Sequence, residues 1–320
     1  MSKIITVFGA TGVQGGSVVA ALLHDKSLKI RAITRNVNSE AAKSLKSKGV
    51  ELATADLNDE NSLAKALEGS NYIFAVTDFF EPFASSGPEA AIKVESAQGI
   101  NLARAASRTP TLEHYIWSTL PNGKRISGGK YLIPHFESKN IIDDYIKQDK
   151  NLFPKTTFVW FTFYAANYLF PMFTPNFVKS SGKHVQIQPS PPNVPIYSIG
   201  DAKANVGIFV RSILNQPGLT LGKFVLAYTE SLTVGQLLEN WSAATGKPSV
   251  YVQTSLEDFD RVWPMWGHEM GIMMKFWEEA QDKSWSGEEG ILTKESLSIK
   301  DAFAGSKKAF ESIDWTNVVT

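Results

Sequence analysis

Short apolar runs alternate with segments of helical spacing along the first half of the chain. The runs are rich in β-branched residues and are typical of strands buried on both faces of a sheet. They cover residues 4–8, 29–34, 50–54, 72–76, 114–118 and 157–163. Between them, apolar residues recur every three or four positions and predict helices over 16–23, 38–48, 61–67, 89–107 and 136–147. These repeated strand–helix–strand units predict a parallel sheet with right-handed crossovers, a Rossmann-type doubly wound α/β fold.

The regular alternation stops at residue 164, where prolines become frequent. A helix over 199–214 with a strand before it, and a strand over 224–228, then predict a return to the sheet. We therefore expect a first domain of residues 1–160 together with about 195–230. Residues 161–194 and 231–320 are expected to form a smaller α+β lobe for a substrate or a partner.

Composition and charge narrow the classes of function. The 32 basic and 32 acidic side chains leave no global basic field for nucleic acid or for an anionic membrane. The chain has no cysteine, which excludes disulfides and thiolate sites, and its five histidines lack metal-ligand spacing, so we expect no metal site. Without a secretory leader or an apolar stretch of about 18 residues, the sequence predicts a cytoplasmic protein, with a nuclear location as the alternative.

A glycine-rich loop follows the first predicted strand and leads into the first helix. In this position, backbone N–H groups and the helix N-terminus can bind a pyrophosphate. The alternative is that the glycines serve only a tight turn and close helix packing. The candidate cofactor-binding residues in this loop are Gly9, Thr11, Gly12, Val13, Gln14 and Gly15.

Arg35 follows the second predicted strand, where an NAD site requires a carboxylate for the ribose 2′-hydroxyl. A guanidinium there suits a 2′-phosphate instead, which predicts NADP(H) as the cofactor. A solvated surface arginine is the alternative. We also expect Asp56 and Leu57 to flank the adenine, although Asp56 equally suits a helix N-cap. Thr77 ends the fourth strand, where it either contacts the nicotinamide ribose or caps a turn.

Several of these segments together resemble the NmrA-like family of atypical short-chain dehydrogenase/reductase relatives, over about residues 3–230. They are GATGVQG, Arg35 within AITRN, ADL at 55–57, AVT at 75–77, IWST at 116–119 and HFESK at 135–139. The resemblance implies an NADP-binding Rossmann domain with a smaller, variable C-terminal lobe. The family includes both reductases and non-catalytic regulators that sense the cofactor.

The wider superfamily implies a catalytic set made of a serine on the fifth strand and a Tyr-x-x-x-Lys motif on the next helix. Ser118 and Lys139 match the serine and the lysine, but His135 stands at the tyrosine position. A histidine is a competent acid or base near neutral pH. His135 is therefore either a catalytic group or a helix-start residue beside the cofactor. In both cases the resemblance implies that Lys139 binds the cofactor.

The lobe offers candidates for a substrate pocket. Tyr164, Asn167 and Tyr168 follow the sixth strand at the sheet edge where ligands bind, although aromatic residues there also suit a core between the lobes. Farther on, large apolar residues recur at helical steps and predict one stripe on a helix, for packing or for a substrate lid or partner surface. They are Trp263, Trp266, Met270, Met273 or Met274, and Trp277.

Two functions follow from these features. In the first, the protein is an NADP(H)-dependent oxidoreductase that reduces a small hydrophobic carbonyl, imine or enone, with Ser118, His135 and Lys139 as its polar groups. In the second, it is a non-catalytic NADP(H)-binding redox sensor that regulates transcription through protein partners, because the catalytic tyrosine is missing. Direct binding of nucleic acid or of a membrane is not expected.

Overall fold

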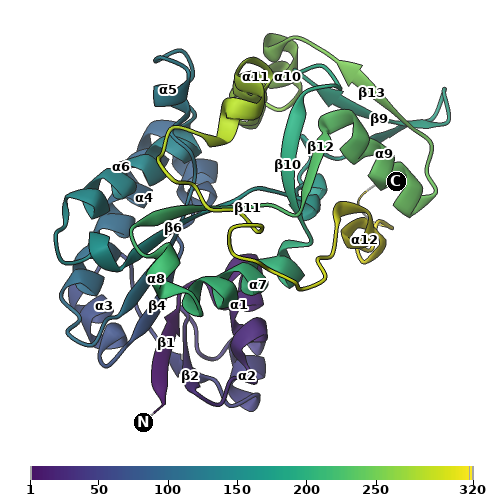
Figure 1. The fold of residues 1–320 in the computed structure, drawn as a ribbon. Coiled ribbons are helices and arrows are strands. Elements are labelled where there is room, and N and C mark those ends of the chain that lie inside the picture. The colour runs from purple at the N-terminus through teal and green to yellow at the C-terminus, as the bar shows by residue number, and fades with distance from the viewer. Residues whose placement is uncertain (1, 317, 319–320) are drawn as a thin grey trace.

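Within residues 2–316 and 318, which the computed structural model describes, seven strands form one parallel sheet (Figure 1). In sheet order they are β11 (Lys223–Ala227), β6 (Thr156–Phe161), β5 (His114–Thr119), β4 (Tyr72–Ala75), β1 (Lys3–Val7), β2 (Leu28–Ile33) and β3 (Glu51–Ala53). The chain reverses its direction of winding between β1 and β4, and ligands of open α/β sheets bind beside this switch point. This confirms the predicted Rossmann-type fold.

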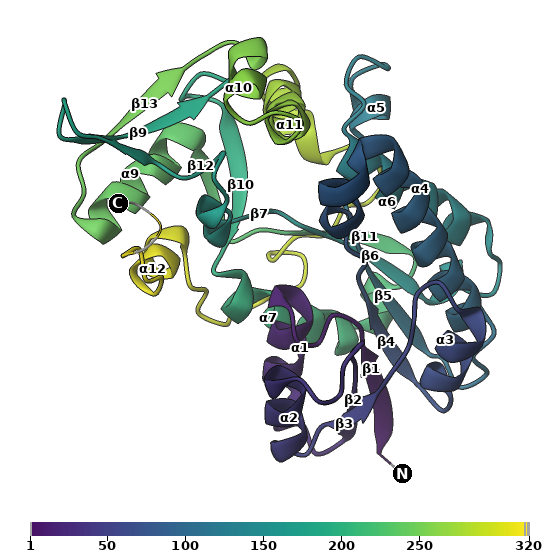
Figure 2. The ribbon, with the colours of Figure 1, turned by 180° about the vertical axis from the view of Figure 1, so that it is seen from behind.

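Helices cover both faces of the sheet (Figure 2). On one face lie α1 (Val13–Leu22), α2 (Glu40–Ser47) and α7 (Ala202–Leu214), and on the other α3 (Glu60–Leu67), α4 (Phe80–Ser107) and α6 (Pro134–Gln148). Because side chains alternate along a strand, Phe74 packs with the α1 and α7 core while its neighbours Ile73 and Ala75 pack with the α3 and α4 core. Burial on both faces explains why the strands are continuous apolar runs.

The helices α1 and α7 pack against each other on their face of the sheet. The backbone N–H of Gly207 donates to Oγ of Ser17 at 2.9 Å. A Cβ atom at position 207 would lie 2.2 Å from the carbonyl oxygen of Ser17. Glycine is therefore required here for the two helices to approach.

The smaller lobe is built on two three-stranded sheets. One contains β12 (Glu230–Thr233), β10 (Pro195–Gly200) and β7 (Phe163–Tyr164), and the other β13 (Ser249–Gln253), β9 (Lys183–Gln188) and β8 (Asn176–Val178). Its helices are α9 (Val234–Thr245), α10 (Leu256–Val262), α11 (Trp266–Ala280) and α12 (Ser306–Glu311). Short turns complete the chain: α5 (Gly123–Ile126), α8 (Pro217–Thr220), η1 (Phe153–Lys155), η2 (Ala165–Leu169) and η3 (Gln281–Trp285).

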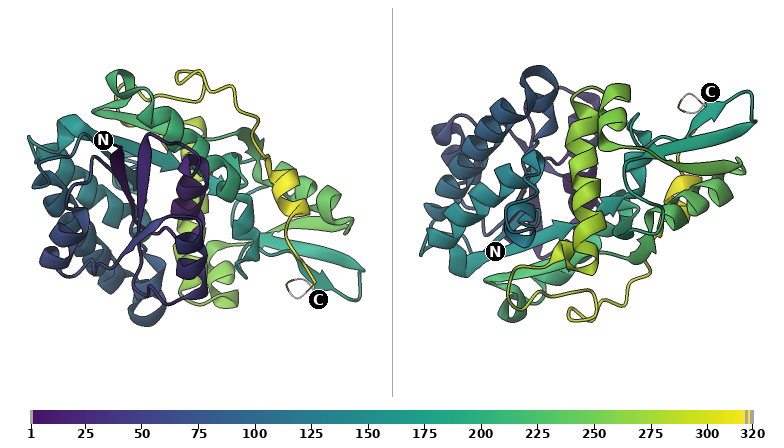
Figure 3. Two further views of the ribbon diagram at one scale, coloured as in Figure 1. Left: turned by 90° about the horizontal axis from the view of Figure 1, so that it is seen from below. Right: turned by 90° about the horizontal axis from the view of Figure 1, so that it is seen from above.

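The helix α11 lies between the domain and the lobe (Figure 3). After it, the chain returns to the edge strand of the large sheet, where the N–H of Leu292 donates to the carbonyl of Phe224 and the N–H of Leu226 to the carbonyl of Leu292, both at 2.8 Å. It then enters the lobe again as α12. None of the helices in the described part of the chain combines the length and the apolar content that a membrane crossing requires.

Three predicted elements differ from the structure. The helix expected over 89–107 begins at Phe80 and bends at Gly87, whose φ is +76°. The helix expected over 199–214 begins only at Ala202, because residues 195–200 form β10 and Asp201 caps the helix. β10 joins the lobe sheet, whereas we expected this segment to return to the large sheet. The strand expected over 157–163 divides into β6 and β7, one in each sheet.

Candidate functional site

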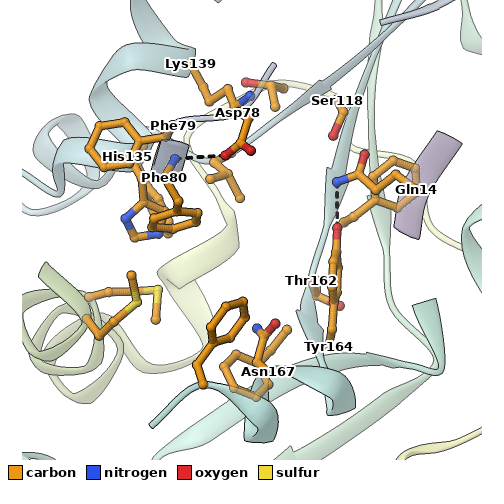
Figure 4. A pocket seen from close by; sticks show the side chains of 18 of the residues that line it. Gln14, Asp78, Phe79, Phe80, Ser118, His135, Lys139, Thr162, Tyr164 and Asn167 are labelled. Atoms are coloured by element: carbon orange, nitrogen blue, oxygen red, sulfur yellow. Dashed lines mark hydrogen bonds between the residues drawn. The ribbon is translucent and has the colours of Figure 1, made fainter. Parts of the chain in front are cut away.

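A pocket of about 290 Å³ lies between the carboxyl edge of the large sheet and the lobe (Figure 4). Its polar side comes from the Rossmann domain and includes Gln14, Thr77, Asp78, Ser118, His135 and Lys139. Its apolar side comes mostly from the lobe and includes Phe163, Phe170, Phe173, Trp266, Met270, Met273 and Trp277. The apolar lining around a few polar groups is characteristic of a small-molecule site.

The glycine loop has the geometry of a phosphate cradle. Gly9 has a φ of +62°, and a Cβ at Gly15 would lie 2.3 Å from the carbonyl oxygen of Gly9. Gly12 is the N-cap of α1 and offers no side chain to the first-turn N–H groups. Thr11 is exposed beside it, and Val13 and Gln14 begin the helix. The loop can therefore take a pyrophosphate on backbone N–H groups at a positive helix end.

The predicted adenosine-binding residues lie at the ends of β2 and β3. Arg35 is exposed, with 80% of its side chain accessible, and its Nη1 contacts Glu81 Oε1 at 2.6 Å. Asp56 is exposed and accepts from the backbone and side chain of Asn58, and Leu57 is half-buried beside it. An exposed guanidinium with part of its donors uncommitted remains accessible to a phosphate group.

Lys139 is held by a buried polar network. Its Nζ lies 2.7 Å from Oε1 of Glu95 and donates to the carbonyl and the hydroxyl of Thr77 at 3.0 and 2.6 Å. The hydroxyl of Thr77 donates in turn to Glu95, and Ser138 bonds the other carboxylate oxygen. Two of the three N–H donors of the ammonium are therefore committed to Thr77, and Glu95 balances its charge. Lys139 and Thr77 both line the pocket.

His135 occupies the second position of α6 and is paired with a carboxylate from the lobe. Its Nδ1 lies 2.5 Å from Oε1 of Glu269 on α11, and the same oxygen accepts its backbone N–H at 3.1 Å. Both side chains are buried, at 8% and 2% exposed. Phe79, Phe80 and Phe136 surround the imidazole ring, with centroid distances of 6.0, 5.5 and 4.7 Å. The ring is therefore fixed in orientation by partners from both parts of the molecule.

Ser118 lies near the end of β5 and is buried at the pocket wall (Figure 4). The residues on either side of it bond to α6: Asp143 accepts hydrogen bonds from Trp117 Nε1 at 2.7 Å and from Thr119 Oγ1 at 2.9 Å. Complete burial raises the pKa of Asp143 to about 7. These bonds join β5 to α6 and hold Ser118 in place between the two neighbouring strand residues.

The predicted substrate residues divide into two groups. Tyr164 and Asn167 line the pocket, and Tyr164 OH accepts from Gln14 Nε2 at 2.6 Å, which joins the lobe to the glycine loop. Burial raises the pKa of the Tyr164 phenol, so this group stays protonated. Tyr168 instead lies in the core of the lobe, where its ring packs on Phe310 at 4.9 Å. It packs there because η2 turns its side chain away from the pocket.

The predicted Trp and Met stripe is divided by a break in the helix. α10 ends before Trp263, and Met265, with a φ of +72°, precedes the start of α11 at Trp266. From there Trp266, Met270, Met273 and Trp277 form one wall of the pocket. Trp266 also stacks on Phe80 of the Rossmann domain at 5.8 Å. The stripe thus serves the pocket and the contact between the two parts.

Sequence reasoning missed several residues around the site, among them Glu95, Glu269, Phe79 and Phe80. Glu95 carried a local signal, because it lies on the same helical face as the buried Ala91 and Leu102. A carboxylate on an apolar face indicates a buried partner. Glu269 carried the same signal, because it lies on one helical face with Trp266 and Met273. The signal did not name its partner, which is 134 residues away in the sequence.

Comparison with known proteins identifies relatives over nearly the whole chain. The model of the NmrA-like family matches residues 1–316. An NmrA-like family domain-containing protein of Dictyostelium discoideum is 29% identical over 87% of this chain and 88% of its own length. The NmrA-like family domain-containing oxidoreductase hkm9 of Aspergillus hancockii is 28% identical over 81% of this chain and 78% of its own.

Solved structures share the fold. The structure of NmrA, a negative transcriptional regulator, in complex with NAD has a TM-score of 0.79 at 20% identity and covers 99% of this chain and 97% of its own. The triphenylmethane reductase of Citrobacter sp. with NADP(H) has a TM-score of 0.67 at 19% identity and covers 97% and 99%. The resemblance expected from the motifs is confirmed and extends beyond residue 230: the chain belongs to the NmrA-like family.

Proposed function

We propose that this protein is an NADPH-dependent oxidoreductase that reduces a small, largely apolar carbonyl, enone or imine. One observation carries the proposal: Ser118 and the buried His135 both line an aromatic pocket that adjoins the glycine loop. Named oxidoreductases among the curated relatives, and family structures with NAD and NADP, support the same reading. The cytoplasm is the proposed location.

The residues that would hold the cofactor follow the strands β1, β2, β3 and β4 or lie on α6. The N–H groups of the glycine loop would bind the pyrophosphate, and Arg35 the 2′-phosphate, with Asp56 and Leu57 beside the adenine. When bound, NADPH supplies a hydride at the carboxyl edge of the sheet. Lys139 and Thr77 would border the nicotinamide ribose, with the charge of Lys139 already balanced by Glu95.

The apolar and the polar residues of the pocket would have different roles in binding the substrate. The aromatic and Met side chains of α11 exclude water and hold an apolar substrate against the sheet. The hydroxyl of Ser118 would donate a hydrogen bond to the substrate oxygen or nitrogen. Tyr164 and Asn167 would border the other end of the substrate, where the lobe meets the glycine loop.

A second function is supported by one specific observation. Lys139 is bonded by Glu95 and Thr77, and the phenol of the usual catalytic motif is replaced by His135. A protein that binds the cofactor without chemistry would tolerate both features. In that function the protein is a redox sensor and transcriptional regulator that changes its binding to a protein partner with the redox state of the nucleotide, in the cytoplasm or the nucleus.

One experiment separates the two functions. Calorimetric titrations with NADPH and NADP+ are followed by NADPH absorbance measurements against aldehydes, quinones, enones and imines. Turnover that falls at least about 100-fold in Ser118→Ala and in His135→Gln supports the reductase. His24→Gln, a change of an exposed histidine, is the matched control. Tight binding that distinguishes the two redox forms without any turnover supports the sensor and contradicts the reductase.

A further inference from the structure

We propose that Glu269 positions His135 as the proton donor of the reaction, so that a lobe helix completes the chemistry of the Rossmann domain. The inference rests on the reductase function proposed above. It assigns a role to the carboxylate of Glu269, which takes no part in the binding of cofactor and substrate proposed above. It also explains how a histidine replaces the phenol of the usual motif.

The bonds of Glu269 determine which ring nitrogen carries hydrogen. A carboxylate only accepts, so Nδ1 of His135, at 2.5 Å from Oε1, must be the donor. The same oxygen accepts the backbone N–H of His135 at 3.1 Å, which fixes the carboxylate against the start of α6. Nε2 is then the nitrogen available to a substrate in the pocket that His135 lines. A catalytic histidine requires this arrangement, in which Nδ1 is held by a hydrogen bond and Nε2 exchanges the proton with the substrate.

The surroundings of the ring make a counter-charge necessary. Phe79, Phe80 and Phe136 enclose the imidazole, and an isolated positive charge among these rings would be costly. Three other charged groups lie near it: Glu269 faces it from α11, Lys139 lies one turn along α6, and Asp78 lines the same pocket. Since Glu95 already balances Lys139, Glu269 is the carboxylate that offsets an imidazolium at position 135.

The proton step balances with the hydride step. For a carbonyl substrate, the hydride forms a C–H bond on the carbon while the C=O π bond breaks toward oxygen. That oxygen takes the proton from Nε2, so the imidazolium becomes a neutral imidazole. The other ring hydrogen remains on Nδ1 and keeps its hydrogen bond to Glu269. NADPH, the carbonyl compound and one proton give NADP+ and the alcohol, and solvent restores the proton on Nε2. Ser118 would donate to the same oxygen.

Glu269→Gln and Glu269→Ala test the positioning role in two ways. The amide of Gln still accepts from Nδ1 but removes the charge, whereas Ala removes both. Glu279→Gln is the matched control, because Glu279 lies on the same helix and pairs with Lys130 at the exposed surface. Thermal unfolding verifies that each variant is folded, and Glu269→Gln serves alone if Glu269→Ala does not fold.

The first readout needs no cofactor. Ring-nitrogen NMR of the free protein should show His135 with hydrogen on Nδ1, its signals being assigned by their loss in His135→Gln. In Glu269→Ala, hydrogen should move toward Nε2, and in Glu279→Gln the spectrum should not change. A neutral His135 with hydrogen on Nε2 alone in the unmodified protein would overturn the proposal.

The second readout is the kinetics of an aromatic aldehyde or enone that the unmodified protein reduces. Glu269→Gln should lower kcat by about 10- to 100-fold, while the calorimetric affinity for NADPH stays within about two-fold. The solvent isotope effect on kcat should rise, because proton transfer becomes slower. Absence of any turnover in the unmodified protein refutes the reductase function and the proton role together. If Glu269→Gln and His135→Gln both leave turnover unchanged, the proton role of the Glu269–His135 pair is refuted, whereas the reductase function is not.

Discussion

The two walls of the pocket differ in how their charges are balanced. On the Rossmann side, Glu95 balances the charge of Lys139, and Asp143 accepts hydrogen bonds from two residues of β5. All of these groups belong to one domain. On the lobe side, the wall is aromatic and Met-rich, and its buried carboxylate, Glu269, points across to His135. The charge of Lys139 is therefore balanced inside the Rossmann domain, whereas His135 takes its carboxylate partner from the lobe. Changes to the first should affect stability, and changes to the second should affect the substrate.

The largest effect is expected when Lys139 is replaced. Lys139→Met leaves Glu95, which is fully buried, without its counter-charge, and the free energy of unfolding should fall by about 3–5 kcal/mol. Urea denaturation measures this loss. The double variant Glu95→Gln, Lys139→Met removes both charges and should recover most of it. A loss below about 1 kcal/mol in the single variant would mean that the Rossmann wall does not depend on this pair.

A change on the lobe wall should separate binding from folding. Trp266→Ala removes the ring that stacks on Phe80 at 5.8 Å and meets Phe83 edge-on at 4.8 Å. The free energy of unfolding should fall by about 2 kcal/mol, and KM for an aromatic substrate should rise by about 10-fold. The calorimetric affinity for NADPH should not change. Trp263→Ala, which lies outside the pocket, is the control, and an equal rise of KM there would contradict the assignment.

The buried carboxyl of Asp143 makes the Rossmann wall sensitive to pH. Its pKa is raised to about 7 from an ordinary 3.8, so between about pH 4 and 7 the folded protein binds a proton that the unfolded chain releases. The free energy of unfolding therefore falls as the pH rises through this window, by at most about 1.4 kcal/mol per pH unit.

Comparison with Asp143→Asn isolates that contribution. Unfolding of both proteins is measured from pH 4 to 8, and the variant should gain stability relative to the unmodified protein as the pH rises. Burial lowers the pKa of His114 to about 4, which has the opposite sign, but this effect is common to both proteins and cancels in the difference. A difference that does not vary with pH would show that Asp143 ionises normally.

The smallest effect on stability is expected at Arg35. Arg35→Asp breaks an exposed ion pair with Glu81 and should change the free energy of unfolding by less than about 1 kcal/mol. If Arg35 binds the 2′-phosphate, the affinity for NADPH should fall by at least about 10-fold while that for NADH is kept or rises. Calorimetry with both nucleotides measures the ratio. An unaltered NADPH affinity would remove Arg35 from the cofactor site.

The Rossmann side was largely predictable from the sequence because its determinants are local. Continuous apolar runs indicated its strands. The carboxyl ends of parallel strands meet at one edge, and Gln14, Thr77, Ser118, His135 and Lys139 line one pocket there. The helix predicted from residue 89 begins earlier, at Phe80, although Pro82, Gly87 and Pro88 are residues that usually end a helix; α4 bends at Gly87 and continues.

The lobe side was less predictable because its partners are distant in the sequence. Nothing near residues 195–200 indicates that β10 pairs with β7 and β12 instead of the large sheet. Tyr168 is close in sequence to Tyr164 and Asn167, yet the 3-10 turn η2 directs it into the lobe core. The pairing of Glu269 with His135 depends on how the lobe folds onto the domain, which no local pattern encodes.

The backbone bonds of Leu292 to β11 have a consequence for synthesis on the ribosome. The edge strand β11 is made before α9, α10 and α11, whereas Leu292, which bonds to it, is made after all three helices. During translation the nascent chain therefore carries an uncovered strand edge while its lobe is still being made, and such an edge can pair with other chains. The bonds of Leu292 to Phe224 and Leu226 can form only after α11 has been made, so synthesis of most of the lobe precedes the protection of this part of the sheet edge.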